Sequence, residues 1–212
     1  MIERGGKSEE RLYIWDDKFD CGDDICIVRK TDMPDLENII ARHEARYYLV
    51  ASFCRPGMKV LDFPCGSGYG SEIINDFDVE YEGRDNDAPS IEYAKLHYCG
   101  EFSVDDLKSP HFVDRTYDVI CCVEGIEHID HLYQSRLVKY FYEALIHGGT
   151  LIVTTPEKGE GVNPHHSHEM NRTEFEALLH EAFIDVQMII RSDVNHKQEK
   201  TNFMTAICRK ED

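Results

Sequence analysis

The sequence predicts an α/β fold with a mostly parallel sheet, helices on both faces and an antiparallel hairpin at one edge. From residue 35 onward, short apolar runs alternate with amphipathic helical stretches, which implies right-handed crossovers between parallel strands. A glycine-rich turn directly follows the first apolar run. The last two runs, at 184–190 and 202–208, are joined only by a polar loop, which fits a closing hairpin.

An amphipathic helix is expected between Asp35 and Phe53, ahead of the first strand. Apolar residues recur there at helical spacing until Pro56-Gly57 stops the pattern. We expect one domain, residues 35–212, preceded by an N-terminal extension, residues 1–34, that serves as a substrate lid.

The turn after the first strand is suited to close contact between the backbone and a ligand. The apolar run ends at Asp62, and Gly66 and Gly68 carry no Cβ to obstruct an approaching molecule. Asp62 would repel a pyrophosphate, so the expected ligand is not a polyphosphate. Pro64 offers no amide and requires an extended backbone at its position.

Later elements follow the same alternation. Residues 79–85 read as a second strand that ends in an acid. Leu137, Phe141 and Leu145 form the apolar stripe of a covering helix that ends at Gly148. The segment 173–176, Thr-Glu-Phe-Glu, predicts a capping box at the start of a further helix.

The ordered set of motifs resembles the class I S-adenosylmethionine (SAM) methyltransferases over roughly residues 36–209. An acid before a CGxGxG turn resembles their first motif, although Pro64 replaces the usual Gly or Ala. Residues 102–107 resemble the third motif, 117–124 the fourth strand, and 148–156 the glycine turn and fifth strand. The resemblance implies a Rossmann-like, seven-stranded sheet with SAM beyond the carboxyl ends of the strands.

The resemblance also implies cofactor contacts by position. Asp85 takes the place of the acid that accepts hydrogen bonds from both ribose hydroxyls, and Asp105 that of the acid at the adenine amino group. The full expected cofactor-binding set is Asp62, Cys65, Gly66, Gly68, Asp85, Asn86, Asp105, Asp106 and Glu124.

Residues 42–48 resemble the HRY-bearing helix of bacterial SAM methyltransferases that are often associated with glycan pathways. This resemblance makes Arg46 or Tyr47 a candidate contact to the methionine part of SAM. An ordinary charged helix face is the alternative.

Acids and histidines gather after the fourth and fifth strands, where methyl transfer is expected. The methyl carbon of SAM is already electrophilic, so the enzyme must align a nucleophile and, for a hydroxyl, remove a proton. The residues expected to do this work are His128, His165 and His168.

The same segment suggests a metal site. Its ExxEH spacing resembles that of the ubiquinone-pathway O-methyltransferases and the small-RNA 3′-terminal 2′-O-methyltransferases, which hold a divalent ion. The ligands would be Glu124, Glu127, His128 and His168, around an ion such as Mg²⁺. Metal-free relatives carry a similar acid and histidine, and an NPxHxxE loop like residues 163–169 that closes over the substrate. A histidine-assisted or purely positional mechanism therefore remains open.

Composition bears on partners and location. The chain carries 23 Lys plus Arg against 41 Asp plus Glu, a formal charge of −18, which disfavours nucleic acid as a partner. No apolar run approaches the roughly 18 residues that span a bilayer, and the N-terminus lacks the apolar region of a signal peptide. We expect a cytoplasmic protein without a membrane partner. The eight cysteines show no CxxC pair, and Cys121 and Cys122 are expected as small core residues on opposite faces of a strand.

These observations predict a SAM-dependent O-methyltransferase for a small-molecule or sugar-like acceptor. One alternative is a metal-dependent RNA 3′-end 2′-O-methyltransferase, and another is a SAM-binding protein without catalysis. An NAD-linked oxidoreductase is disfavoured because the glycine turn has the wrong neighbours for a pyrophosphate. The sequence carries no signal for the oligomeric state or for the identity of the acceptor.

Overall fold

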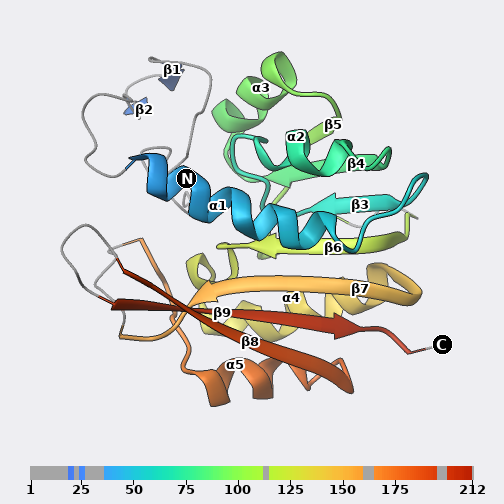
Figure 1. Ribbon diagram of the computed structural model, residues 1–212, viewed down its shortest axis with the longest axis vertical. Coiled ribbons are helices and arrows are strands. Elements are labelled where there is room, and N and C mark those ends of the chain that lie inside the picture. Colours follow the sequence, from blue (N-terminus) through green and yellow to red (C-terminus); the bar gives the residue numbers. More distant parts are fainter. Residues whose placement is uncertain are drawn as a thin grey trace.

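The computed structural model describes residues 19–21, 24–26, 36–111, 115–159, 165–194 and 200–211. Its main sheet has seven strands in the order β5-β4-β3-β6-β7-β9-β8, and β9 alone runs antiparallel to its neighbours (Figure 1). The strands are β3 (Lys59–Asp62), β4 (Glu80–Asp85), β5 (Glu101–Val104), β6 (Tyr117–Val123), β7 (Leu145–Pro156), β8 (Asp185–Val194) and β9 (Lys200–Arg209). The predicted fold class and edge hairpin are confirmed.

Helices cover both faces of this sheet, and Figure 1 shows α1 in front of it and α4 behind it. The helices are α1 (Leu36–Ala51), α2 (Gly70–Asn75), α3 (Ala88–His97), α4 (His131–Ala144) and α5 (Arg172–Leu179), with a 3₁₀ turn, η2 (Ile126–His128). Residues of β6 alternate between two cores: Cys121 packs with α1, α2 and α3, whereas Cys122 packs with α4 and α5. Both cysteines are buried on opposite faces, as predicted.

Two helix boundaries differ from the predictions. The covering helix ends at Ala144 rather than Gly148, because Leu145 takes an extended conformation and opens β7. The side chain of Leu145 still enters the same core, so it continued the helical stripe in the sequence. The capping box lies two residues earlier than predicted: Asn171 Oδ1 accepts from the Glu174 amide at 3.0 Å, and Glu174 Oε2 accepts from the Asn171 amide at 2.9 Å.

The predicted N-terminal extension lies mostly outside the described residues. Its described parts are β1 (Phe19–Cys21) and β2 (Asp24–Cys26), which pair antiparallel. The predicted lid role of residues 1–34 stays a prediction. Among the described residues, no helix is long and apolar enough to cross a membrane.

Candidate functional site

The glycine turn after β3 holds a backbone shape that other residues rarely adopt. Gly66 and Gly68 have φ values of +57° and +88°. A Cβ on Gly68 would lie 2.7 Å from Ala94 Cβ and 3.0 Å from the Phe102 ring. The turn therefore packs tightly against α3 and β5, and only glycine fits at position 68 without displacing these side chains.

Asp85 ends β4 and ties the glycine turn to the start of the next helix. Its Oδ2 accepts from the Gly66 amide and its Oδ1 from the Asp87 amide, both at 2.9 Å. Asn86, the next residue along the chain, is partly buried. Cys65 is buried, and its amide donates to the Arg84 carbonyl at 2.8 Å. Asp85 and Cys65 thus link the glycine turn to the end of β4. The cofactor roles of these residues stay predictions.

Asp62 lies in the protein interior. Its carboxylate is fully buried and accepts from the Tyr81 hydroxyl at 2.7 Å and from Cys121 Sγ at 3.3 Å. Burial raises the pKa of Asp62 to about 7, and these hydrogen bonds oppose the rise. Tyr47 is also buried and occupies the space that a side chain on Gly70 would need. Tyr47 therefore helps to build the core beneath the turn.

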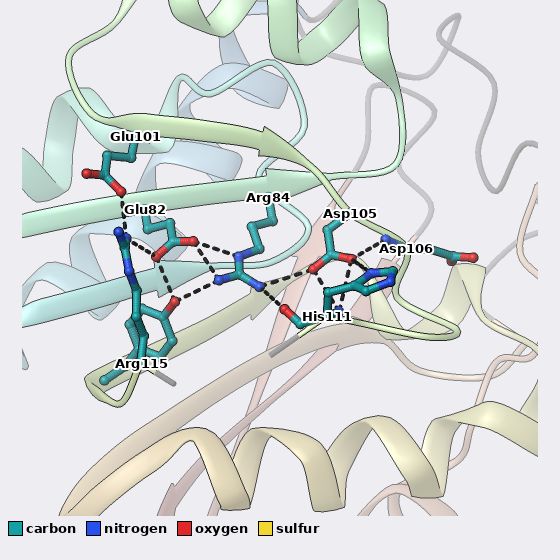
Figure 2. Close-up of polar contacts among 8 residues, drawn as sticks. Glu82, Arg84, Glu101, Asp105, Asp106, His111 and Arg115 are labelled. Carbon is teal, nitrogen blue, oxygen red and sulfur yellow. Dashed lines mark hydrogen bonds and ion pairs between the residues drawn. The ribbon is translucent and has the colours of Figure 1, made fainter. Parts of the chain in front are cut away.

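The two acids after β5 differ in their surroundings (Figure 2). Asp105 is buried among protein donors, which include Arg84 Nη1 at 3.1 Å and the Asp106 amide at 2.8 Å. Asp106 is exposed, and its carboxylate points away from Arg84. Arg84 was not predicted as a site residue, because most of its partners lie more than 20 residues away along the chain.

Glu124, at the end of β6, is paired with helix α1. Its backbone has a φ of +49°, and its Oε1 lies 3.3 Å from Arg46 Nε and accepts from the Thr154 hydroxyl at 3.0 Å. The Arg46 guanidinium also lies 4.3 Å from the centroid of the Phe203 ring. Arg46 thus joins α1 to the ends of β6 and β9.

Glu127 is a buried acid within η2. Its Oε2 accepts from the Thr155 hydroxyl at 3.2 Å, and its carbonyl accepts from the amides of Ser167 and His168. Burial, and then the negative charge of Glu124, raise the pKa of Glu127 well above its usual range. This carboxyl group therefore favours its protonated form in the folded protein.

His128 and His166 lie together beside Glu127. Their ring centroids are 4.9 Å apart in an edge-to-face arrangement. His128 Nδ1 donates to the His165 carbonyl at 3.2 Å, and His166 Nδ1 donates to Glu169 Oε1 at 2.5 Å. Because each Nδ1 carries the proton, each Nε2 is the basic nitrogen. His165, a predicted catalytic residue, takes part in this arrangement through its main-chain carbonyl, which accepts from His128.

His168 turns toward α4 instead. Its Nδ1 donates to Gln134 Oε1 at 3.0 Å, and its ring lies 5.5 Å from that of His131. The buried Gln134 amide nitrogen donates to the carbonyls of Ile126 and His168. Gln134 therefore fixes the loops after β6 and β7 together.

The predicted metal set is only partly brought together. Ligand atoms of Glu127, His128 and His166 lie within 4.8 Å of one another, whereas Glu124 is paired with Arg46 and His168 with Gln134. One carboxylate with two imidazoles suits zinc or a first-row transition metal better than Mg²⁺, which prefers oxygen ligands. His166 and Glu169 were not among the predicted site residues, although they occupy the H and E positions of the NPxHxxE pattern.

This arrangement can accept and hold a proton. His166 offers a basic nitrogen whose opposite side is fixed by a carboxylate, as in other carboxylate–histidine pairs. The glycine turn and the acids after β4 and β5 lie along the same carboxyl edge of the sheet. We call the β3–β5 part of this edge the binding half and the β6–β7 part the proton-transfer half, after the roles that are predicted for them.

The chain is similar to known proteins over most of its length. A family model described as a methyltransferase domain matches residues 39–203. A probable S-adenosylmethionine-dependent methyltransferase of Mycobacterium tuberculosis is 30% identical over 164 residues, which cover 73% of this chain and 59% of that protein. The chain thus matches about three fifths of the length of this relative.

Two further proteins differ in the acceptor that their names give. The mitochondrial ubiquinone biosynthesis O-methyltransferase of Mus musculus is 29% identical over 111 residues, covering 48% of this chain and 30% of that protein. A structure of phosphoethanolamine N-methyltransferase 2 of Haemonchus contortus, with phosphomonomethylethanolamine and S-adenosylhomocysteine, superposes with a TM-score of 0.67 at 15% identity. The superposition covers 79% of this chain and 52% of the Haemonchus contortus chain, and it shows a shared fold.

Proposed function

Because this chain belongs to the methyltransferase-domain family, we propose that it transfers the methyl group of SAM to an oxygen of a small-molecule or sugar-like acceptor. Bound SAM would supply a methyl carbon on a sulfonium that is already electrophilic. The chain must therefore hold the cofactor, align the acceptor and take up the proton that a hydroxyl loses.

The His166–Glu169 pair is the observation that supports oxygen as the methyl acceptor. This pair lies beside His128 and Glu127. Glu169 holds the Nδ1 proton of His166, which directs the basic Nε2 toward another partner. A hydroxyl has a high pKa and needs a base when it attacks, whereas an amine can attack in its neutral form. The pair thus supports an acceptor that must lose its proton during transfer.

The cofactor would be held by the binding half of the edge. Gly66 and Gly68 would present backbone without side chains to its nucleoside, and Asp85 provides a carboxylate at the end of β4. These residues fit the group, because a nucleoside needs close backbone contact and a carboxylate acceptor for its ribose hydroxyls.

The test is a transfer assay with labelled SAM and pairs of acceptors that differ only in a hydroxyl or an amine. We expect label on the hydroxyl compound, because the histidine can take up the proton that the hydroxyl loses. Transfer to the amines alone would contradict O-methylation and leave methyl transfer intact. Calorimetry with SAM and its demethylated product comes first, because a chain that binds neither would overturn the whole proposal.

A metal-assisted version of the reaction is a second candidate, favoured by the closeness of Glu127, His128 and His166. A divalent ion held there would lower the pKa of a bound hydroxyl. Excess chelator separates the two: full activity would exclude the metal, and recovery with zinc or manganese better than with magnesium would support it.

Two other functions fit less well. RNA-end methylation would need a surface that attracts a polyanion, and the formal charge of −18 opposes this. A SAM-binding protein without catalysis would give no purpose to the hydrogen-bonded acid and histidine cluster. We therefore propose a small-molecule acceptor as the partner.

A further inference from the structure

We propose that the outer edge of β8 pairs antiparallel with the same strand of a second copy of the chain, about a twofold axis at Met188. This pairing would join the two seven-stranded sheets into one continuous sheet. The inference goes beyond the proposed function, because it depends neither on the cofactor nor on the methyl acceptor.

The two edges of the main sheet differ in length and in protection. At one edge, β5 has four residues, and its Glu101 pairs with Arg115 at 2.6 Å. At the other edge, β8 has ten residues and pairs with β9 without interruption. Among the described residues, no strand pairs with the outer side of β8. Long edge strands present unpaired N–H and C=O groups, which proteins usually protect with lysine, proline or a bulge. β8 has none of these features.

One face of β8 carries apolar side chains up to this open edge. Val186 and Met188 pack against the core formed with α4 and α5. Ile190 lies on the same face by strand alternation and is 41% exposed. Ile184, directly ahead of the strand, is 73% exposed. A second copy of the strand would extend this apolar face, because the Met188-centred register places Val186 opposite Ile190 of the other copy.

The other face of β8 carries one acid and one base that lie symmetrically about Met188. Asp185 lies three residues before Met188 and Arg191 three residues after it, and both are exposed. In the proposed pairing, Asp185 of each copy faces Arg191 of the other copy. Opposite charges that face each other across antiparallel strands stabilise the strand pair. The strand is therefore complementary in charge to a second copy of itself.

The charges select this register from the alternatives. A twofold strand pair must be centred on a residue, because residues that face each other direct their main-chain groups either both toward the partner strand or both away from it. A centre at Gln187 would place Asp185 opposite Ile189, and a centre at Ile189 would place Arg191 opposite Gln187. Within β8, only the centre at Met188 places Asp185 and Arg191 opposite each other.

This pairing would leave the candidate site of each copy open. β8 runs parallel to β7, because both pair antiparallel with β9. In an antiparallel pair of β8 strands, the carboxyl edges of the two copies therefore lie at opposite ends of the joined sheet.

The experiment measures the mass of the full chain by sedimentation equilibrium between about 1 and 500 μM, a range that suits a strand-edge interface of modest area. We expect a dimer whose fraction rises with concentration. A chain that stays a monomer throughout this range would overturn the proposal.

Two charge reversals test the register. Arg191→Asp places two acids opposite each other, and Asp185→Arg places two arginines opposite each other. Each variant alone should raise the Kd of the dimer by about tenfold or more, because two contacts change from attraction to repulsion. An equimolar mixture of the two variants should restore association, because the acids of one then face the arginines of the other. Native mass spectrometry identifies this heterodimer by its mass.

Lys95→Asp is the matched control. It makes the same change of charge as Arg191→Asp, but on α3, which Figure 1 shows at the opposite end of the sheet from β8. We expect its Kd to stay within about twofold of wild type. A dimer that persists unchanged in both charge reversals, or a mixture that forms no heterodimer from folded variants, would overturn the proposed interface.

Hydrogen exchange of the wild type decides the question if a charge reversal does not fold. Asp185→Arg carries this risk, because position 185 also faces Arg209 of β9. The outward amides of β8 should exchange more slowly at high than at low protein concentration. Exchange that does not depend on concentration would overturn the proposal. Slow exchange of these amides in a monomer would mean that another segment of the chain covers the edge, and it would also overturn the proposal.

Discussion

The binding half and the proton-transfer half of the sheet edge satisfy their carboxylates in different ways. At β3–β5, Asp85 and Asp105 accept from backbone amides or from a guanidinium. At β6–β7, Glu127 is buried with a threonine hydroxyl, near a second acid, and its pKa is raised. The amide and guanidinium donors at these two acids do not titrate in the working range. Asp62, at the end of β3, differs from them, because it is buried with a tyrosine hydroxyl and its pKa is raised. The second half holds groups whose protonation can change, which is what transfer chemistry needs.

The strongest test of this contrast is His166→Asn. If His166 Nε2 accepts the acceptor's proton, its loss should lower kcat by about 10²- to 10⁴-fold while cofactor affinity stays within about twofold. The measurement is labelled methyl transfer together with calorimetry of S-adenosylhomocysteine. His147→Asn is a suitable control, because His147 is exposed at the opposite end of β7. An equal loss of affinity in His166→Asn would mean that the two halves are not separate.

Gly68→Ala tests the fixed shape of the binding half. The new Cβ would meet Ala94 at 2.7 Å and would sit on a backbone with φ of +88°. We expect a loss of about 3 kcal/mol in the free energy of unfolding, measured in urea. Gly57→Ala has a similar φ of +79° but no atom within 4 Å of the new Cβ, so it isolates the backbone strain, about 1–2 kcal/mol. Equal losses in both variants would show that the close approach to Ala94 is unimportant.

Asp85→Ala tests the carboxylate of the same half. Removing hydrogen bonds to a charged group should weaken S-adenosylhomocysteine by about 10- to 100-fold, corresponding to about 1.5–3 kcal/mol. Calorimetry gives the affinity, and Glu80→Gln at the exposed start of β4 serves as the control. Unchanged affinity would refute the ribose role.

Asp62→Asn tests the acid of the binding half that departs from this contrast. Burial raises the pKa of Asp62 from 3.8 to about 7, so the folded protein holds this proton more tightly than the unfolded chain does. Ionisation therefore costs stability progressively as the pH rises through this window. Relative to wild type, the variant should gain about 2 kcal/mol in unfolding free energy between pH 5 and pH 8. Urea unfolding at both pH values measures this, and a constant difference would contradict the raised pKa.

The fold was readable from the sequence because local signals agree with the final topology. Strand and helix alternation, the glycine turn and the last apolar pair each depend on short segments. The site was less readable because its contacts join distant segments. Arg84 donates to Glu82, Asp105 and Tyr117, and the residue type at position 84 does not predict these partners.

The arrangement of the histidines in residues 165–168 was also not predictable from the sequence. His165, His166 and His168 are equivalent candidates by composition, and their roles depend on how the loop turns over Glu127 and Gln134. Likewise, an acid at the end of a strand does not reveal whether its side chain points outward. Asp62 points into the core, toward Tyr81 and Cys121.

Gln134 has a practical consequence for redesign. Its one buried amide group holds the carbonyls of Ile126 and His168 and the ring of His168. The loops that follow β6 and β7 are therefore a single transplantable unit. Anyone grafting a new acceptor specificity onto this scaffold should exchange both loops with this glutamine, since a graft of either loop alone would leave main-chain oxygens unpaired.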